Sequence, residues 1–176
     1  MKTLRLATTW LDGCSGCHMS LLDTDERLLH LMERVSLVYS PLVDVKEFPE
    51  DVDVALVEGA ISSAEDLETI HLIRRRAKVL VAFGDCGVTG NVPALRNRFH
   101  PDAILQRAYF DTADVQAQVP RAGVPTLLPR ARPIQELVKV DFHLPGCPPP
   151  ADLIYHVLSE LVEGRTPSLA GRFRFG

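Results

Sequence analysis

The sequence contains no long apolar run and no excess of positive charge, and both absences limit what the protein can be. No stretch of its 176 residues approaches the ~20 consecutive apolar residues that a membrane-spanning helix needs. Its 19 Lys and Arg against 23 Asp and Glu give a net charge of −4, which argues against nucleic acid or an anionic membrane as the main partner. We therefore expect neither partner.

The start of the chain also lacks the features of an export signal. Residues 1–13 form a short strand-like run, without the apolar stretch of about 7–15 residues and the small-residue cleavage site of a signal peptide. The Arg74-Arg75-Arg76 run is internal, so it is not a twin-arginine signal. We expect a cytoplasmic protein, in which cysteines stay reduced unless they bind metal or take part in chemistry.

Cysteine is scarce, and its number is informative. Four cysteines are too few for a disulfide scaffold in a chain of this size. Four is, however, the number that closes one tetrahedral metal or cluster site. The length predicts a single domain over residues 1–176, long enough to bury a core of its own.

Strand-like runs alternate with helical patterns along the chain. Expected strands cover residues 4–10, 35–39, 52–57, 78–83 and 140–144, and expected helices cover residues 18–34, 62–76, 133–138 and 151–163. This alternation predicts an α/β fold with a mainly parallel sheet, most simply a flavodoxin-like three-layer sandwich. We expect an irregular insertion at about residues 88–132 and an extended tail at residues 165–176.

The cysteines share one structural position in this prediction. Cys14 and Cys17 follow the first expected strand, Cys86 follows the fourth, and Cys147 follows the last. Loops at the carboxyl ends of parallel strands lie at the same edge of the sheet, where ligands bind. Glycines accompany every cysteine, and glycine allows the backbone to approach a bulky group closely. The four thiols are therefore predicted to meet at one site.

Each cysteine alone also has a simpler interpretation. A solitary cysteine such as Cys86 or Cys147 is usually a small buried hydrophobe. The Cys14 and Cys17 pair alone fits zinc or a thioredoxin-type dithiol, but zinc usually takes two such pairs, and a dithiol leaves the other two cysteines unexplained. We favour a four-thiolate cluster site. FMN in this chain is not expected, because no phosphate-binding run rich in Ser, Thr and Gly follows the first strand.

Four motifs, in this order, resemble the small subunit of nickel–iron hydrogenases. They are Gly13-Cys14-Ser15-Gly16-Cys17, Val57-Glu58-Gly59-Ala60, Gly84-Asp85-Cys86-Gly87 with Gly90-Asn91-Val92-Pro93-Ala94, and Pro145-Gly146-Cys147-Pro148-Pro149. The resemblance covers nearly the whole chain, and its most specific parts are the C-terminal Gly-Cys-Pro-Pro and the spaced single cysteines. The run LDGCSGCHMS at residues 11–20 is most similar to the cytoplasmic, NAD-reducing (bidirectional) branch.

The resemblance implies that Cys14, Cys17, Cys86 and Cys147 bind one 4Fe–4S cluster. It implies an electron-transfer subunit of hydrogen:NAD oxidoreductase without a catalytic residue of its own, because the nickel–iron centre belongs to a separate large subunit. Longer small subunits carry a C-terminal extension with further clusters. Without one, electrons are expected to pass to a diaphorase module that carries iron–sulfur clusters, FMN and NAD. Sulfhydrogenase, deazaflavin-reducing and sensory branches of the family are the alternatives.

Three positions near the motifs require separate comment. Many respiratory small subunits have Glu where this chain has Met19, which leaves any proton route through that position in doubt. His18 either makes a hydrogen bond close to the site or faces solvent, and Glu58 either belongs to the family's Glu-Gly element or only caps backbone at a strand end. The related quinone-reducing complex has two adjacent cysteines in the first motif, whereas Ser15 and Gly16 separate them here.

Overall fold

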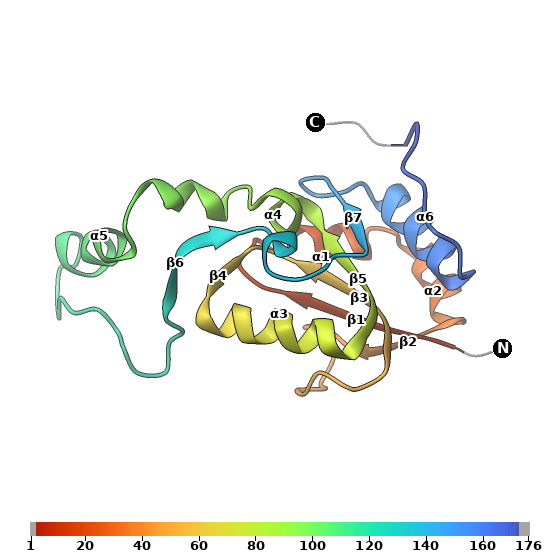
Figure 1. The fold of residues 1–176 in the computed structure, drawn as a ribbon, viewed down its shortest axis with the longest axis horizontal. Coiled ribbons are helices and arrows are strands. Elements are labelled where there is room, and N and C mark those ends of the chain that lie inside the picture. The colour runs from red at the N-terminus through yellow and green to blue at the C-terminus, as the bar shows by residue number, and fades with distance from the viewer. Residues whose placement is uncertain (1–2, 173–176) are drawn as a thin grey trace.

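The computed structural model describes residues 3–172 of the chain, and within them the sheet has the predicted topology. Five strands pair in the order β2-β1-β3-β5-β7, and every pairing is parallel (Figure 1). These strands are β1 (Leu4–Trp10), β2 (Val35–Tyr39), β3 (Val52–Glu58), β5 (Ala77–Phe83) and β7 (Phe142–Leu144). This strand order is that of flavodoxin-like folds, so the predicted fold class is confirmed.

Helices cover both faces of the sheet and bury two separate apolar cores. The helices of the chain are α1 (Gly16–Leu22), α2 (Glu26–Met32), α3 (Ala64–Arg76), α4 (Gly84–Thr89), α5 (Pro101–Gln106) and α6 (Ala151–Val162). On one face, α1, α2 and α6 contribute Leu21, Leu31 and Ile154 to the core. On the other face, α3 contributes Ile70 and Ile73. Full burial of one such side chain stabilises the fold by about 1.5–3 kcal/mol.

α3 begins two residues after the predicted start, and side chains cap its first turn. Ser63 and Asp66 form a capping box, because the amide of Asp66 donates to Ser63 Oγ at 3.1 Å and the amide of Ser63 donates to Asp66 Oδ2 at 2.9 Å. This reciprocal pair satisfies two amides at the helix start. The basic end of the same helix is anchored by Arg74, which lies 2.5 Å from Asp141 Oδ2.

The single helix predicted for residues 18–34 is wrong, because two helices occupy this stretch. The chain leaves α1 after Leu22 and begins α2 at Glu26. Between them the Thr24 hydroxyl donates to the carbonyl of Leu21 at 2.7 Å, and Asp25 has a φ of 52°. A positive φ cannot continue a right-handed helix. The helical spacing of apolar residues in the sequence therefore continues past the point where the first helix ends.

The stretch predicted as irregular contains several short elements. They are η1 (Pro93–Arg98), α5, the π-helical turn η2 (Arg107–Asp111) and β6 (Leu127–Arg132), which pairs antiparallel with β4 (Ile61–Ser63). Pro93 begins η1, a position that suits proline. β6 was not predicted, because it contains Pro129 and proline is confined to edge strands and bulges. Figure 1 shows α5 and the following loop projecting away from the main sheet.

The end of the chain is mostly as expected. The turn η3 (Ile134–Glu136) lies within the predicted short helix, and α6 ends at Val162, one residue before the predicted end. Residues 165–172 form no helix or strand, and residues 173–176 of the predicted tail lie outside the described range. Among the described residues, no helix is both long and apolar enough to cross a membrane.

Candidate functional site

The cysteine segments all lie at the carboxyl edge of the main sheet. Cys14 and Cys17 follow β1, Cys86 lies in α4 directly after β5, and Cys147 follows β7. No helix was predicted at residues 84–89, whereas the short helix α4 begins there at Gly84. The parallel order of the strands brings these segments, distant in sequence, to one side of the molecule.

Close contacts show that the segments meet. A Cβ atom added to Gly84 would lie 2.2 Å from Cys17 Sγ and 3.5 Å from the carbonyl oxygen of Gly146. Gly84 has a φ of +80° and Gly146 a φ of +136°, so both positions favour glycine through backbone conformation as well as space. The glycines beside the cysteines therefore allow the backbone to come within contact distance of the thiols.

Hydrogen bonds tie the segments to one another. The amide of Asp85 donates to the carbonyl of Gly146 at 2.8 Å, and the amide of Gly146 donates to Asp85 Oδ1 at 2.7 Å. Ser20 Oγ donates to the carbonyl of Pro149 at 2.6 Å. The side-chain amide of Asn91 donates to Cys147 Sγ at 3.4 Å. The loops after β1, β5 and β7 are thus linked without any bound group.

Burial and neighbouring negative groups raise the pKa of two of the thiols. Burial is the main cause that raises the pKa of the Cys17 thiol, the Glu58 carboxylate is the second, and the other three cysteines each add to the rise. Burial also raises the pKa of Cys86, followed by Cys147 and Cys14. Four thiolates here would repel one another, and a cationic metal core would supply the missing counter-charge.

The donor set suits an iron–sulfur cluster. All four cysteines are free; Cys17 is buried, Cys86 is half-buried, and Cys14 and Cys147 are exposed. In the described part of the chain, no three His, Cys, Asp or Glu side chains form a group that could hold a metal ion. A 4Fe–4S cluster makes a different demand, since it takes four cysteine thiolates distributed over its irons.

His18 and Glu58 form a buried pair beside this site. His18 Nδ1 lies 2.5 Å from Glu58 Oε2, and both residues are 1% exposed. The solvent-facing alternative for His18 is therefore wrong. Glu58 does accept a backbone amide, from His18 at 3.1 Å, but it also binds the imidazole. The only signal for this pair in the sequence was weak, a glutamate ending an apolar strand and a histidine next to a cysteine.

The surface around the thiols carries exposed apolar side chains. Met19 on α1 is 59% exposed, and Val92 and Leu95 beside and within η1 are 62% and 61% exposed. Val92 adjoins Asn91, whose side chain contacts Cys147. Apolar side chains exposed together are typical of a surface that binds another protein.

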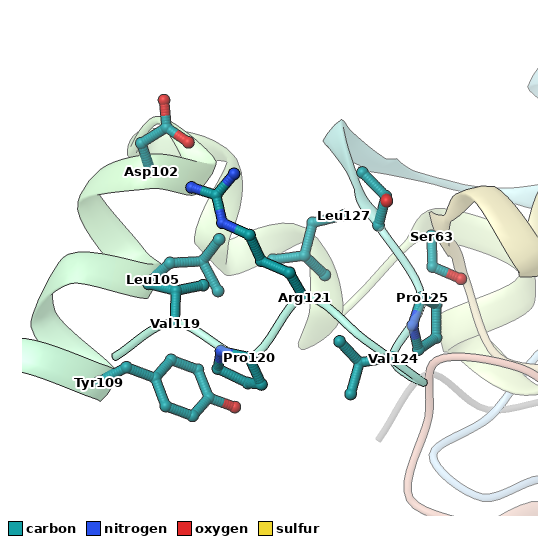
Figure 2. Close-up of a pocket in the computed structure, with 11 residues that line it drawn as sticks. Ser63, Asp102, Leu105, Tyr109, Val119, Pro120, Arg121, Val124, Pro125 and Leu127 are labelled. Atoms are coloured by element: carbon teal, nitrogen blue, oxygen red, sulfur yellow. The ribbon is translucent and has the colours of Figure 1, made fainter. Parts of the chain in front are cut away.

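The segment that projects from the sheet, formed by α5, η2 and the loop after them, lines an open cavity of about 590 Å³ together with Ser63 and Leu127. Figure 2 shows Asp102, Leu105 and Tyr109 from α5 and η2 on one side of it, and the loop that carries Val119 and Arg121 on another. None of the four cysteines lines this cavity. It is therefore separate from the thiol site.

Comparisons with known proteins agree with this arrangement. The family model described as NADH ubiquinone oxidoreductase, 20 Kd subunit, matches residues 14–161. The delta subunit of the NAD-reducing hydrogenase HoxS of Cupriavidus necator is 42% identical, over 97% of this chain and 85% of that protein. A subunit of the vhu F420-non-reducing hydrogenase of Methanocaldococcus jannaschii is 38% identical over 90% of this chain, which spans only 56% of that protein. A solved chain of NAD+-reducing NiFe-hydrogenase in the H2-reduced state superposes with a TM-score of 0.92 and 41% identity, over 99% of this chain and 97% of that chain.

Proposed function

The chain belongs to the family of the NADH ubiquinone oxidoreductase 20 kDa subunit, and we propose that it is the electron-transfer small subunit of an NAD-reducing nickel–iron hydrogenase. The observation that carries the proposal is that three segments bearing four free cysteines come together at one edge of the sheet. The similarity to the HoxS delta subunit extends over nearly the whole chain, which supports this branch of the family.

We propose that Cys14, Cys17, Cys86 and Cys147 hold one 4Fe–4S cluster, which when bound takes up and releases single electrons. The chain's own residues position the thiolates. Gly84 leaves room for Cys17, and the Asn91 amide donates to the sulfur of Cys147. Hydrogen bonds to sulfur and solvent exposure are the means by which a protein sets a cluster's potential.

The proposed partners follow from what this chain does not contain. Its four cysteines are all assigned to one cluster, so the hydrogen-splitting nickel–iron centre is proposed to lie in a large subunit. We further propose that electrons pass from this chain to a diaphorase module with its own clusters, FMN and NAD. NAD reduction of this kind belongs in the cytoplasm, the location predicted from the sequence.

Two other assignments are separable from this one. The family also includes subunits of the quinone-reducing complex, but the two adjacent cysteines expected there are separated here by Ser15 and Gly16. The F420-non-reducing hydrogenase subunit of M. jannaschii is 38% identical to this chain. Identification of the subunits that copurify distinguishes these cases, since the proposed function requires a nickel–iron large subunit together with a flavin-bearing diaphorase.

The test is anaerobic purification from the native host with subunit identification, followed by metal analysis. We expect about four irons and about four acid-labile sulfides for each copy of this chain's cluster, and an EPR signal on reduction. Replacing Cys86 or Cys147 by Ser should abolish that signal. A thioredoxin-type dithiol at Cys14 and Cys17 would instead keep its activity in those two variants. A protein without iron and sulfide would overturn the proposal.

A further inference from the structure

A chain of four buried polar side chains leads from the first cysteine loop into the sheet. His18 lies 2.5 Å from Glu58 Oε2 through Nδ1 and 3.0 Å from Thr8 Oγ1 through Nε2. Thr8 Oγ1 in turn lies 2.9 Å from Ser40 Oγ. These four residues are at most 3% exposed. The electron-relay role proposed above does not by itself account for them.

Stability is a poor explanation for this arrangement. Removing ionisable groups from water is costly even when they are paired, and replacing a buried pair with well-packed apolar residues often leaves a protein equally stable or more so. The surroundings would suit apolar residues, because the rings of Trp10 and Phe83 lie 5.3 and 6.0 Å from the imidazole. The pair is better explained by what it holds in place.

Glu58 holds the backbone next to Cys17. Its Oε2 atom accepts a hydrogen bond from the amide of His18 at 3.1 Å as well as the contact from the imidazole. The N-cap residue of α1, Ser15, makes no side-chain capping bond. The Glu58 carboxylate therefore accepts a hydrogen bond from a first-turn amide that would otherwise lack a partner. That amide belongs to the peptide unit that joins Cys17 to His18. The cysteine backbone is thereby tied to the end of β3.

The imidazole is held from the opposite side as well. Thr8 lies on β1, which pairs with β3 in the middle of the sheet, and Ser40 in turn accepts a hydrogen bond from the amide of Leu42 at 3.2 Å. His18 therefore spans two adjacent central strands. Side chains held at both ends by rigid elements are the ones that keep a site in a fixed geometry.

We propose that His18 and Glu58 are positioning residues that hold Cys17 in the orientation needed to bind the cluster, and that Thr8 and Ser40 hold the imidazole. The inference rests on the proposed function, because it needs a cluster at Cys17. Replacement of groups that orient metal ligands typically weakens metal retention or activity 10–100-fold. Rearranged hydrogen bonds and solvent access also change a cluster's reduction potential.

Four substitutions in the anaerobically purified complex separate the contacts. His18→Asn retains an amide near the Nδ1 position, facing Glu58, whereas His18→Gln places its amide near Nε2, facing Thr8. Glu58→Gln removes the charge at nearly constant shape, and Thr8→Val removes the hydroxyl. His30→Gln on α2 is the matched control, since His30 is exposed and lies outside the buried chain. Circular dichroism of each variant establishes that the fold is retained.

The measurements are cluster loss to a chelator, the EPR line shape and an EPR-monitored redox titration. We expect His18→Gln and Glu58→Gln to lose the cluster about 10–100-fold faster. A tenfold change in the protein's relative affinity for the oxidised and the reduced cluster corresponds to a shift of about 59 mV in a one-electron reduction potential. His18→Asn should retain the cluster for longer than His18→Gln does, close to the wild-type rate of cluster loss, and His30→Gln should match the wild type.

The outcomes distinguish the proposed function from the positioning role. Wild-type protein without iron and sulfide overturns the proposed function, and the inference with it. Wild-type protein with a cluster, but with His18→Gln, Glu58→Gln and Thr8→Val all unchanged in retention, spectrum and potential, overturns the positioning role alone. If Glu58→Gln does not fold, Thr8→Val and the two His18 variants still decide the outcome.

Discussion

Replacing Gly84 with alanine tests whether Cys17 must occupy its observed position for the site to work. Gly84 begins α4 with a φ of +80°, a conformation that costs an ordinary residue about 1–2 kcal/mol. The added Cβ would also lie 2.2 Å from Cys17 Sγ, whereas ordinary contact begins at 3.4 Å. Cys17 is 7% exposed, so its sulfur has little free space into which to retreat.

The size of the required movement sets the expected result. The sulfur would have to move by about 1.2 Å, the difference between 3.4 and 2.2 Å, while distances at a metal site keep within about 0.2 Å of their usual values. A thiolate moved this far no longer reaches its iron unless the surrounding backbone moves too. We therefore expect the Gly84→Ala complex to contain about four fewer irons and about four fewer sulfides than the wild-type complex, a loss that backbone strain alone would not cause.

Gly123→Ala is the matched control, because Gly123 has a φ of +72° and open space around its Cβ position. It should cost about 1–2 kcal/mol in urea unfolding and leave iron and sulfide per chain at the wild-type level. Both variants are purified anaerobically with their partner subunits and assayed for metal, sulfide and EPR signal. A Gly84→Ala protein with full cluster content would refute the reasoning, and equal cluster loss in Gly123→Ala would attribute the effect to backbone strain.

Three further substitutions test other parts of the structure. Asp85→Ala removes the acceptor of the Gly146 amide and should destabilise the contact between the loops after β5 and β7 by about 1–3 kcal/mol. The cluster should then be lost at a lower urea concentration. Cluster loss at the wild-type urea concentration would mean that the two loops do not depend on this bond. Ser63→Ala removes the cap of α3 and should lower the free energy of unfolding by about 1 kcal/mol while iron content stays constant. Burial alone would raise the pKa of Asp141, but hydrogen bonds, chiefly from Arg74, hold that pKa below its usual value. The ionised Asp141 therefore stabilises the fold fully above about pH 4, and this stabilisation is lost as the pH falls through the lowered pKa. Asp141→Asn should accordingly reduce the dependence of urea unfolding on acid pH.

Much of the sheet could be predicted because its signals are local. β1 and β2 match their predicted ranges, and β3 and β5 are each only one residue longer. β1, β3 and β5 are mostly buried, so they read as short apolar runs bounded by turn residues. The position of each cysteine after a strand then placed the thiols at one edge, since parallel strands order their loops without any further information.

The errors arose where the structure depends on backbone conformation or distant partners. Asp25 ends the first helical pattern through a positive φ, which no apolar period reports. β4 exists because β6 pairs with it across more than 60 residues. β4 has only three residues, and Pro129 interrupts the strand pattern of β6. The contact between His18 and Glu58 joins residues 40 positions apart, so only the folded arrangement reveals it.

The four thiols differ in solvent exposure, and this difference indicates which side of the site a partner subunit would cover. Cys17 is held from inside by Glu58 through the amide of His18, whereas Cys14 and Cys147 are exposed. Solvent exposure is one of the factors that set a cluster's potential, so a subunit that covers this face would change the potential as well as shield the thiols. Exposed Met19, two residues after Cys17, and exposed Val92, next to the Asn91 that contacts Cys147, offer apolar area to such a subunit. The partner would therefore complete the cluster's environment, because this chain supplies a rigid inner wall and leaves the outer side open.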